Sequence, residues 1–97
     1  MFEIQFTTEA RSDIKTLRRG DQVSVMAAVE SQLSRDANRP TRNRKKLRPN
    51  PIANWELRVG EFRVFYNVDA HARVVSVEAI GFKIGNVLFI RNERQSL

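Results

Sequence analysis

The stretch of sequence that decides the fold is Trp55-Glu-Leu-Arg-Val-Gly-Glu-Phe-Arg-Val-Phe-Tyr-Asn-Val68. Apolar and polar side chains alternate on both sides of Gly60-Glu61, which predicts two antiparallel strands joined by a two-residue turn. This turn places Arg58 opposite Arg63 and sorts the side chains onto two faces. The apolar face is expected to pack in the core, with Trp55 as an anchor. It carries Trp55, Leu57, Val59, Phe62, Val64 and Tyr66.

The other face of this hairpin points to a function. It carries Glu56, Arg58, Arg63 and Phe65. Like charges that face each other destabilise a strand pair, so the two arginines suggest an anionic ligand. An arginine can hold a phosphate bidentately, and an aromatic ring can stack on a base. A carboxylate can remove the proton of a ribose 2′-hydroxyl. The alternative is a solvated lattice of ion pairs, each worth ~0–1 kcal/mol, and the spacing alone leaves both interpretations open.

The composition limits the class of protein. A chain of 97 residues supports a single domain, residues 1–97, with one modest core. It has no cysteine and one histidine, His71, which excludes disulfide frameworks and thiolate or multi-histidine metal sites. We therefore expect no metal and no cofactor. No apolar run approaches the ~18 residues of a membrane span, and a strand beginning near Met1 leaves no room for a signal peptide, so we expect a cytoplasmic protein.

The positive charge, a net +6, is concentrated before the hairpin. Seven of the seventeen basic residues lie between Arg35 and Arg48, where Asp36 is the only acid. All three prolines fall in the segment 36–54, which we interpret as an extended basic loop. Such a loop either binds phosphates or is a charged loop without a ligand. The candidate RNA contacts in it are Arg42, Arg44, Lys45, Lys46 and Arg48.

Two helices are expected before the loop. A strand over residues 2–6 precedes a helix that Thr8 caps and Gly20 ends. Asp13 is expected to face solvent on this helix, and Asp21 to cap a second one. The apolar stripes that should pack on the sheet are Ala10, Ile14 and Leu17 in the first helix and Val25, Val29 and Leu33 in the second.

The remaining strands complete the sheet. Burial of Val75 and Val77 favours a strand from Arg73 to Gly81 in a register that places Glu78 beside Arg63. A short edge strand is expected over residues 87–90, followed by a frayed end. The order of elements predicts an α+β fold, in which a two-helix hairpin packs on one face of a mainly antiparallel sheet of four to five strands.

As a set, these residues resemble the RelE/ParE superfamily of bacterial toxins from type II toxin–antitoxin systems. The resemblance is carried by Lys46-Leu-Arg48, by the hairpin 55–68, and by Val74-Val-Ser-Val-Glu-Ala-Ile-Gly81 followed by Lys83. It implies a RelE-like fold and one of two activities. RelE-like members cut mRNA in the ribosomal A site without a metal, and ParE-like members poison DNA gyrase. It also implies a cognate antitoxin as partner, in a complex that binds operator DNA.

The resemblance also implies roles for single residues. Arg63 matches the arginine that grips the scissile phosphate, and Arg58 matches a basic residue on the preceding strand. Lys83 matches the basic residue that follows the glycine of the fourth strand. Two positions depart from the pattern. Glu56 stands where RelE-like toxins carry a lysine, and Phe89, which lacks a hydroxyl, stands where they carry a catalytic tyrosine.

The favoured hypothesis is the RelE-like branch, a metal-independent mRNA endonuclease that acts on the ribosome. In it Arg63 and Arg58 hold the phosphate, Lys83 stabilises charge, and Glu56 or Glu78 is the base. Arg63→Ala is then expected to abolish toxicity and to leave the fold intact. The alternative is a ParE-like gyrase poison or a degenerate toxin that retains antitoxin binding. A plain RNA-binding module is a third interpretation.

Overall fold

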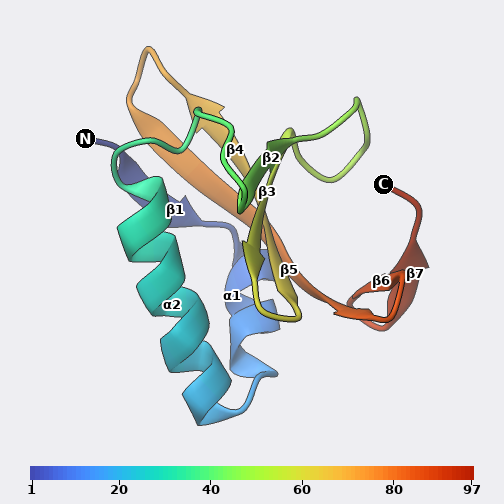
Figure 1. Cartoon of the computed structure of the whole chain (residues 1–97). Helices are drawn as coiled ribbons and strands as arrows, with labels where there is room; N and C mark the ends of the chain where they lie inside the picture. Colours follow the sequence, from blue (N-terminus) through green and yellow to red (C-terminus); the bar gives the residue numbers. More distant parts are fainter.

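The computed structural model describes residues 1–97 as two helices on a seven-stranded sheet. The elements are β1 (Glu3–Phe6), α1 (Thr8–Lys15), α2 (Arg19–Leu33), β2 (Arg44–Lys46), β3 (Trp55–Val59), β4 (Phe62–Asp69), β5 (Val74–Ile84), β6 (Val87–Ile90) and β7 (Glu93–Gln95). The strand order is β2-β3-β4-β5-β6-β7, and β1 lies parallel to β5. Both helices lie on one side of the sheet (Figure 1). The α+β prediction is confirmed, with more strands than expected.

The hairpin of β3 and β4 has the predicted register. Arg58 lies opposite Arg63, and Trp55 lies opposite Tyr66. Trp55 and Tyr66 stack with ring centroids 6.1 Å apart, inside the main core beneath the helices. The Tyr66 hydroxyl donates a hydrogen bond of 2.7 Å to the carbonyl of Ala37. Burial raises the pKa of Tyr66 well above its usual range, so this donor stays protonated.

The helix ends differ from the prediction. The N-cap of α1 is Thr7, not Thr8, because the Thr7 hydroxyl accepts a hydrogen bond of 3.1 Å from the Ala10 amide. The helix already ends at Lys15, where the Thr16 hydroxyl bonds back to the Asp13 carbonyl at 2.6 Å. Gly20 therefore does not stop α1. It lies with Asp21 in the first turn of α2, so the proposed Asp21 cap is also wrong.

The second helix packs as predicted. Its buried residues are Val25, Val29 and Leu33. They belong to the main core together with the apolar side of β3 and β4. The alternation of the hairpin predicted that this side of the two strands faces the core. The spacing of apolar residues along this helix was therefore sufficient to orient it.

The basic loop contains a strand that the sequence does not signal. β2 pairs antiparallel with β3, so the prediction of a loop throughout 36–54 is wrong for Arg44–Lys46. Backbone hydrogen bonds of 2.8 Å extend this pairing at both ends, from Leu47 to Asn54 and from Arg58 to Asn43. The unpaired main-chain groups at the edge of β3 therefore form hydrogen bonds with this charged segment and hold it as a strand, although its side chains have little preference for strand structure.

The register between β4 and β5 also differs from the prediction. Arg63 lies opposite Gly81, not Glu78. The pairing shifts by one residue between Phe65 and Tyr66, because a β-bulge leaves Glu78 as the extra residue of β5. The bulge accounts for only one residue of the error. The predicted register implies Val75 opposite Tyr66, but Val77 lies there, so the pairing is already two residues off before the bulge. A shift of two residues keeps every side chain on its predicted face, so the burial pattern alone could not exclude it.

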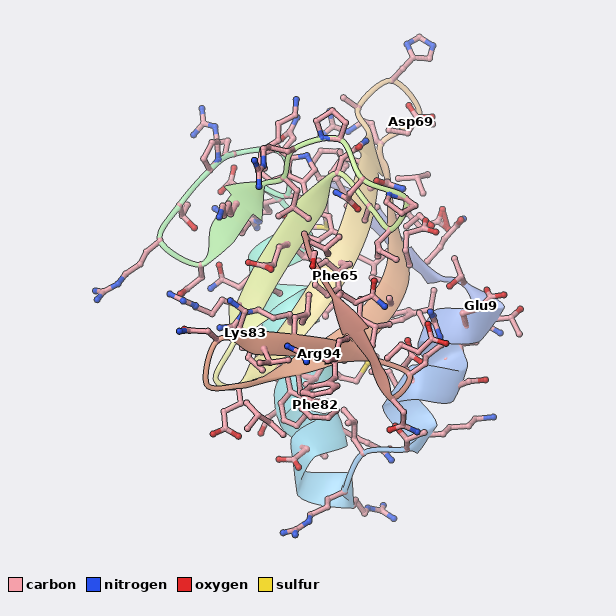
Figure 2. All side chains as sticks on the ribbon, turned by 90° about the vertical axis from the view of Figure 1, so that its right-hand side faces the viewer. Glu9, Phe65, Asp69, Phe82, Lys83 and Arg94 are labelled. Carbon is pink, nitrogen blue, oxygen red and sulfur yellow. The ribbon has the colours of Figure 1, made fainter.

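The C-terminal hairpin, β6 and β7, builds a second core. The segment 87–90 forms the expected strand, but β7 covers its edge, so the chain end pairs in the sheet where fraying was predicted. β5 carries this hairpin across the sheet face that the helices leave open (Figures 1 and 2). The second core lies between hairpin and sheet and consists of Ala53, Phe65, Ala79, Leu88 and Ile90.

Gly81 of β5 lies so close to this hairpin that a side chain has no room there. A methyl group there would lie 2.6 Å from the Phe89 carbonyl oxygen and 2.9 Å from Ile90 Cγ1. Because backbone has to move, we expect Gly81→Ala to lower the free energy of unfolding by about 1–3 kcal/mol, measured by chemical denaturation. Gly20→Ala is the matched control, since nothing lies within 4 Å of its added methyl group, and it should stabilise by ~0.4–1 kcal/mol. Equal stability of the two variants would contradict this close contact.

Candidate functional site

Five charged side chains lie on the open face of the sheet, opposite the helices. Lys45 of β2 lies opposite Glu56 of β3, and Arg58 lies opposite Arg63 of β4. Lys83 follows two residues after Gly81, the partner of Arg63, and alternate residues of a strand share a face. We call this group the cationic face. It consists of Lys45, Glu56, Arg58, Arg63 and Lys83.

The charges of the cationic face are not paired with one another. The only ion pair in the structure with an N–O distance within 4 Å joins Asp13 to Arg91, outside this group. The lattice of ion pairs that the sequence allowed is therefore not formed. Two arginines and two lysines stand beside a single carboxylate, an arrangement that favours binding of an anion.

Arg63 forms the floor of the cationic face. Its side chain is only 6% exposed, and Nη1 donates hydrogen bonds of 2.7 and 2.8 Å to the carbonyls of Gly60 and Phe62. Desolvation lowers the pKa of Arg63, the carboxylate of Glu56 acts in the opposite direction, and Arg58 lowers the pKa further. These bonds fix the guanidinium across the β3–β4 turn. We therefore expect Arg63→Ala to disturb this turn, in place of the expectation from the sequence that it leaves the fold intact.

Part of the Arg63 guanidinium remains available to a ligand. Nε and Nη2 donate no hydrogen bond within the protein. Every fully buried side-chain nitrogen in the structure has a hydrogen-bond partner. Because Nε and Nη2 have none, they are not fully buried and retain contact with solvent. The Nε–Nη2 edge is the one that binds phosphate oxygens bidentately.

Phe65 cannot stack on a base, so this prediction is wrong. Its side chain is fully buried and packs against Leu88 and Ile90 of the C-terminal hairpin. Figure 2 shows β6 and β7 crossing in front of the sheet near Phe65. The alternation correctly placed Phe65 on the open face, but the hairpin that covers this part of the face was not foreseen.

Arg44 and Glu78 also lie outside the candidate site. Arg44 is buried on the helix side, where its guanidinium donates to the Gln32 carbonyl at 2.8 Å and to the Arg39 carbonyl at 3.0 Å. It therefore supports the end of α2 and cannot bind RNA as predicted. Glu78 is the bulge residue and accepts a hydrogen bond of 2.7 Å from the Ser76 hydroxyl, so the predicted contact with Arg63 does not form.

The other predicted RNA contacts are exposed beside the cationic face. Arg42 and Arg48 flank β2, and Lys45 and Lys46 lie on it. β2 is the outer strand of the sheet, so these four exposed residues form a basic edge next to the cationic face. Lys45 is on that face, whereas Lys46, opposite Trp55, is on the helix side of the strand.

Phe89 lies on the other side of the sheet from Arg63. It pairs with Phe82 across β5 and β6, and their rings stack with centroids 5.5 Å apart. Phe82 follows Gly81 and so faces the opposite side. The residue that the resemblance placed at the catalytic tyrosine position is therefore not part of the cationic face.

Two residues outside the predicted site prove to be linked. Asp13 is buried, so its assignment as solvent-facing is wrong, and it pairs with Arg91 at 3.1 Å. The helical spacing contained a signal, because Asp13 lies between Ala10 and Leu17 at i+3 and i+7 of one stripe. The identity of the partner could not be read, since Arg91 is distant in sequence.

No three His, Asp or Glu side chains lie close enough together to hold a metal ion. None of the helices is both long and apolar enough to span a membrane.

Comparisons with known proteins agree with this architecture. Residues 4–82 match the family described as the ParE toxin of the type II toxin–antitoxin system parDE. A chain in the crystal structure of the RelBE2 toxin–antitoxin complex from Mycobacterium tuberculosis is 27% identical, with a TM-score of 0.72 over 84% of this chain and 91% of that one. The archaeal RelE–RelB complex from Pyrococcus horikoshii OT3 contains a chain with the same fold, 14% identical, with a TM-score of 0.68 over 88% and 97% of the two chains. No curated protein matches significantly. The chain belongs to the ParE toxin family of type II toxin–antitoxin systems, within the RelE/ParE superfamily.

Proposed function

We propose that this toxin is a metal-independent, ribosome-dependent mRNA endonuclease of the cytoplasm. The observation that carries the proposal is the single carboxylate, Glu56, among cations that have no ion-pair partner in the protein. A base surrounded by phosphate-binding groups is the arrangement that RNA cleavage through the 2′-hydroxyl requires.

The reaction follows from these groups. Glu56 takes the proton of the 2′-hydroxyl, and the oxygen attacks the adjacent phosphorus. Arg58 and the free edge of Arg63 hold the phosphate oxygens, and Lys83 stabilises the charge that develops on them. The bond to the 5′ oxygen then breaks, giving a 2′,3′-cyclic phosphate and a 5′-hydroxyl. Water supplies the proton of the leaving oxygen, since the only tyrosine, Tyr66, lies in the main core.

The basic edge of β2 extends the binding surface for RNA. Arg42, Lys45, Lys46 and Arg48 are all exposed, with no acidic residue among them. Contacts of this kind with phosphates are electrostatic and independent of sequence. The edge would therefore hold ribosomal RNA or the mRNA backbone and add affinity without choosing the cleavage site.

The test is induced expression in bacteria with mapping of new mRNA 5′ ends. Arg58→Ala is a cleaner variant than Arg63→Ala, because the Arg58 side chain is exposed and supports no turn. Losing one charged hydrogen-bond donor should lower the cleavage rate by about 10- to 100-fold, equivalent to roughly 1.5–3 kcal/mol. Arg11→Ala, at an exposed arginine of α1, is the control and should cleave like the parent. Cleavage unchanged in Arg58→Ala would show that the cationic face is not the site.

A second candidate is a gyrase poison that acts by binding alone. It is favoured by the match to the ParE family and by the absence of a tyrosine or histidine from the cationic face. Trapped gyrase and DNA breaks on induction, with intact mRNA, would support it. A toxin that causes neither form of damage but still binds its antitoxin would be the degenerate homologue.

For either activity we propose a cognate antitoxin as partner. The two solved structures described above are toxin–antitoxin complexes, with RelB in the archaeal case. Co-expression with an antitoxin encoded by a small open reading frame adjacent to the toxin gene should abolish toxicity and yield a purified complex. Binding of that complex to its own operator DNA would be tested by a mobility shift.

A further inference from the structure

Strand β5 changes its neighbour halfway along one edge. β1 pairs with residues 74–77 and β6 with residues 82–84, so residues 78–81 have no strand beside them on that edge. Side chains take the place of the missing strand. The Ile80 amide donates to Asp13 Oδ2 at 3.0 Å, and the Glu78 carbonyl accepts from Thr7 Oγ1 and Arg91 Nη2, each at 3.3 Å.

Asp13 and Arg91 connect elements that are otherwise separated here. Arg91 Nη2 lies 3.1 Å from Asp13 Oδ2, so the pair joins α1 to the turn between β6 and β7. A cavity of about 710 Å³ lies between these parts, and both residues line it. Among the hydrogen bonds and ion pairs of the structure, this ion pair is the one that joins helix and turn across the cavity.

The backbone of this turn is unfavourable for arginine, which indicates that the Arg91 side chain has a role there. Arg91 and Asn92 have φ values of 52° and 66°, as in the two-residue turns for which asparagine and glycine are preferred. Asparagine tolerates this backbone, but for arginine the left-handed region costs about 1–2 kcal/mol. A residue that breaks the local rule needs a compensating contact, and the pairing with a carboxylate that is only 7% exposed provides it.

We infer that Asp13 is a positioning residue, which acts through Arg91 to hold the C-terminal hairpin at a fixed angle over the open face. The hairpin covers Phe65 and Ala79, and its backbone contacts β5 at Gly81, directly opposite Arg63. The pair thereby sets how far the hairpin lies from Arg63, the residue opposite Gly81 on the open face. This role does not rest on the proposed function, since the position of the hairpin is a property of the protein alone.

The absence of cysteine allows a direct measurement. Asn43→Cys before β2 and Arg94→Cys on β7 place one spin label next to the outer strand of the sheet and one on the C-terminal hairpin, both at exposed positions. Electron–electron distance measurements on the purified full chain should give one narrow distribution. Asp13→Asn should lengthen the mean distance and broaden the distribution. Glu9→Gln, at an exposed glutamate that lines the same cavity, is the matched control and should leave it unchanged.

A second variant separates the positioning role of Asp13 from a role in stability alone. Arg91→Gln lies in an exposed turn and should reproduce the broad distribution, and the double variant should be no broader than either single one. An unchanged distribution in Arg91→Gln, or in a folded Asp13→Asn whose melting temperature alone falls, would overturn the inference. None of these readouts needs RNA cleavage. If the parent chain does not cleave RNA, but the variants still show a displaced hairpin, the proposed function is contradicted and the positioning role is supported.

Discussion

Phe65→Ala is expected to lower the free energy of unfolding by about 3–5 kcal/mol, the usual cost of removing a fully buried phenylalanine. The side chain fills the second core beneath the C-terminal hairpin, which contains only four other buried residues, Ala53, Ala79, Leu88 and Ile90. Small domains are stable by only ~5–15 kcal/mol, so the variant would lose a large part of its stability. Urea denaturation followed by circular dichroism measures this loss.

The same experiment decides between the two roles considered for Phe65. Phe89→Ala is the matched control, because its half-buried ring only stacks on Phe82, an interaction worth about 0.5–1.5 kcal/mol beyond the area buried. The loss at Phe65 should clearly exceed the loss at Phe89. A Phe65→Ala variant with parental stability but weakened RNA binding would instead restore the base-stacking role that the burial of the ring rejects.

Glu56→Gln is expected to slow RNA cleavage by about 10²–10⁴-fold, the usual contribution of a general base. The substitution keeps the size of the side chain and removes its ability to accept the proton of the 2′-hydroxyl. It also removes the only negative charge of the cationic face, so binding of RNA should be retained or strengthened. Purified toxin, programmed ribosomes and single-turnover kinetics would separate the rate of cleavage from the affinity.

Glu61→Gln provides the control for Glu56→Gln. Glu61 is an exposed glutamate in the adjacent turn and is not on the cationic face, so its variant should cleave at the parental rate. A Glu56→Gln variant that cleaves as fast as the parent would eliminate Glu56 as the base. If that result came with trapped gyrase in cells, the binding-only candidate would take its place.

The prediction of the fold from the sequence was most accurate where interactions are local. The alternation around Gly60-Glu61 gave the register of β3 and β4 correctly, because a two-residue turn permits few others. The helical spacing of Val25, Val29 and Leu33 similarly gave the buried side of α2. Errors of a few residues arose at the helix ends, where hydrogen bonds of Thr7 and Thr16 compete with glycine and aspartate signals.

The candidate site was predicted only in part, for a different reason. Glu56, Arg58 and Arg63 share a face because alternation requires it, and the structure keeps them together. Three predicted residues are not in the site because of interactions with distant parts of the chain. Glu78 lies at the β-bulge, the C-terminal hairpin covers Phe65, and Arg44 binds the end of α2. Their side chains have the right chemistry, but chemistry alone does not determine whether a residue reaches solvent.

By itself, the sequence determined that this chain forms helices on a mainly antiparallel sheet and carries an excess of positive charge on one face of its central hairpin. These properties depend on turn chemistry and on the periodicity of side chains, which act over a few residues. Only the tertiary structure decided which of those charges remain free, that Arg63 is the floor of the face, and that Asp13 reaches Arg91. The Asp13–Arg91 contact joins residues far apart in the chain, and the exposure of each charge depends on the distant elements that pack over it. Such desolvation and close packing are not encoded in a local pattern.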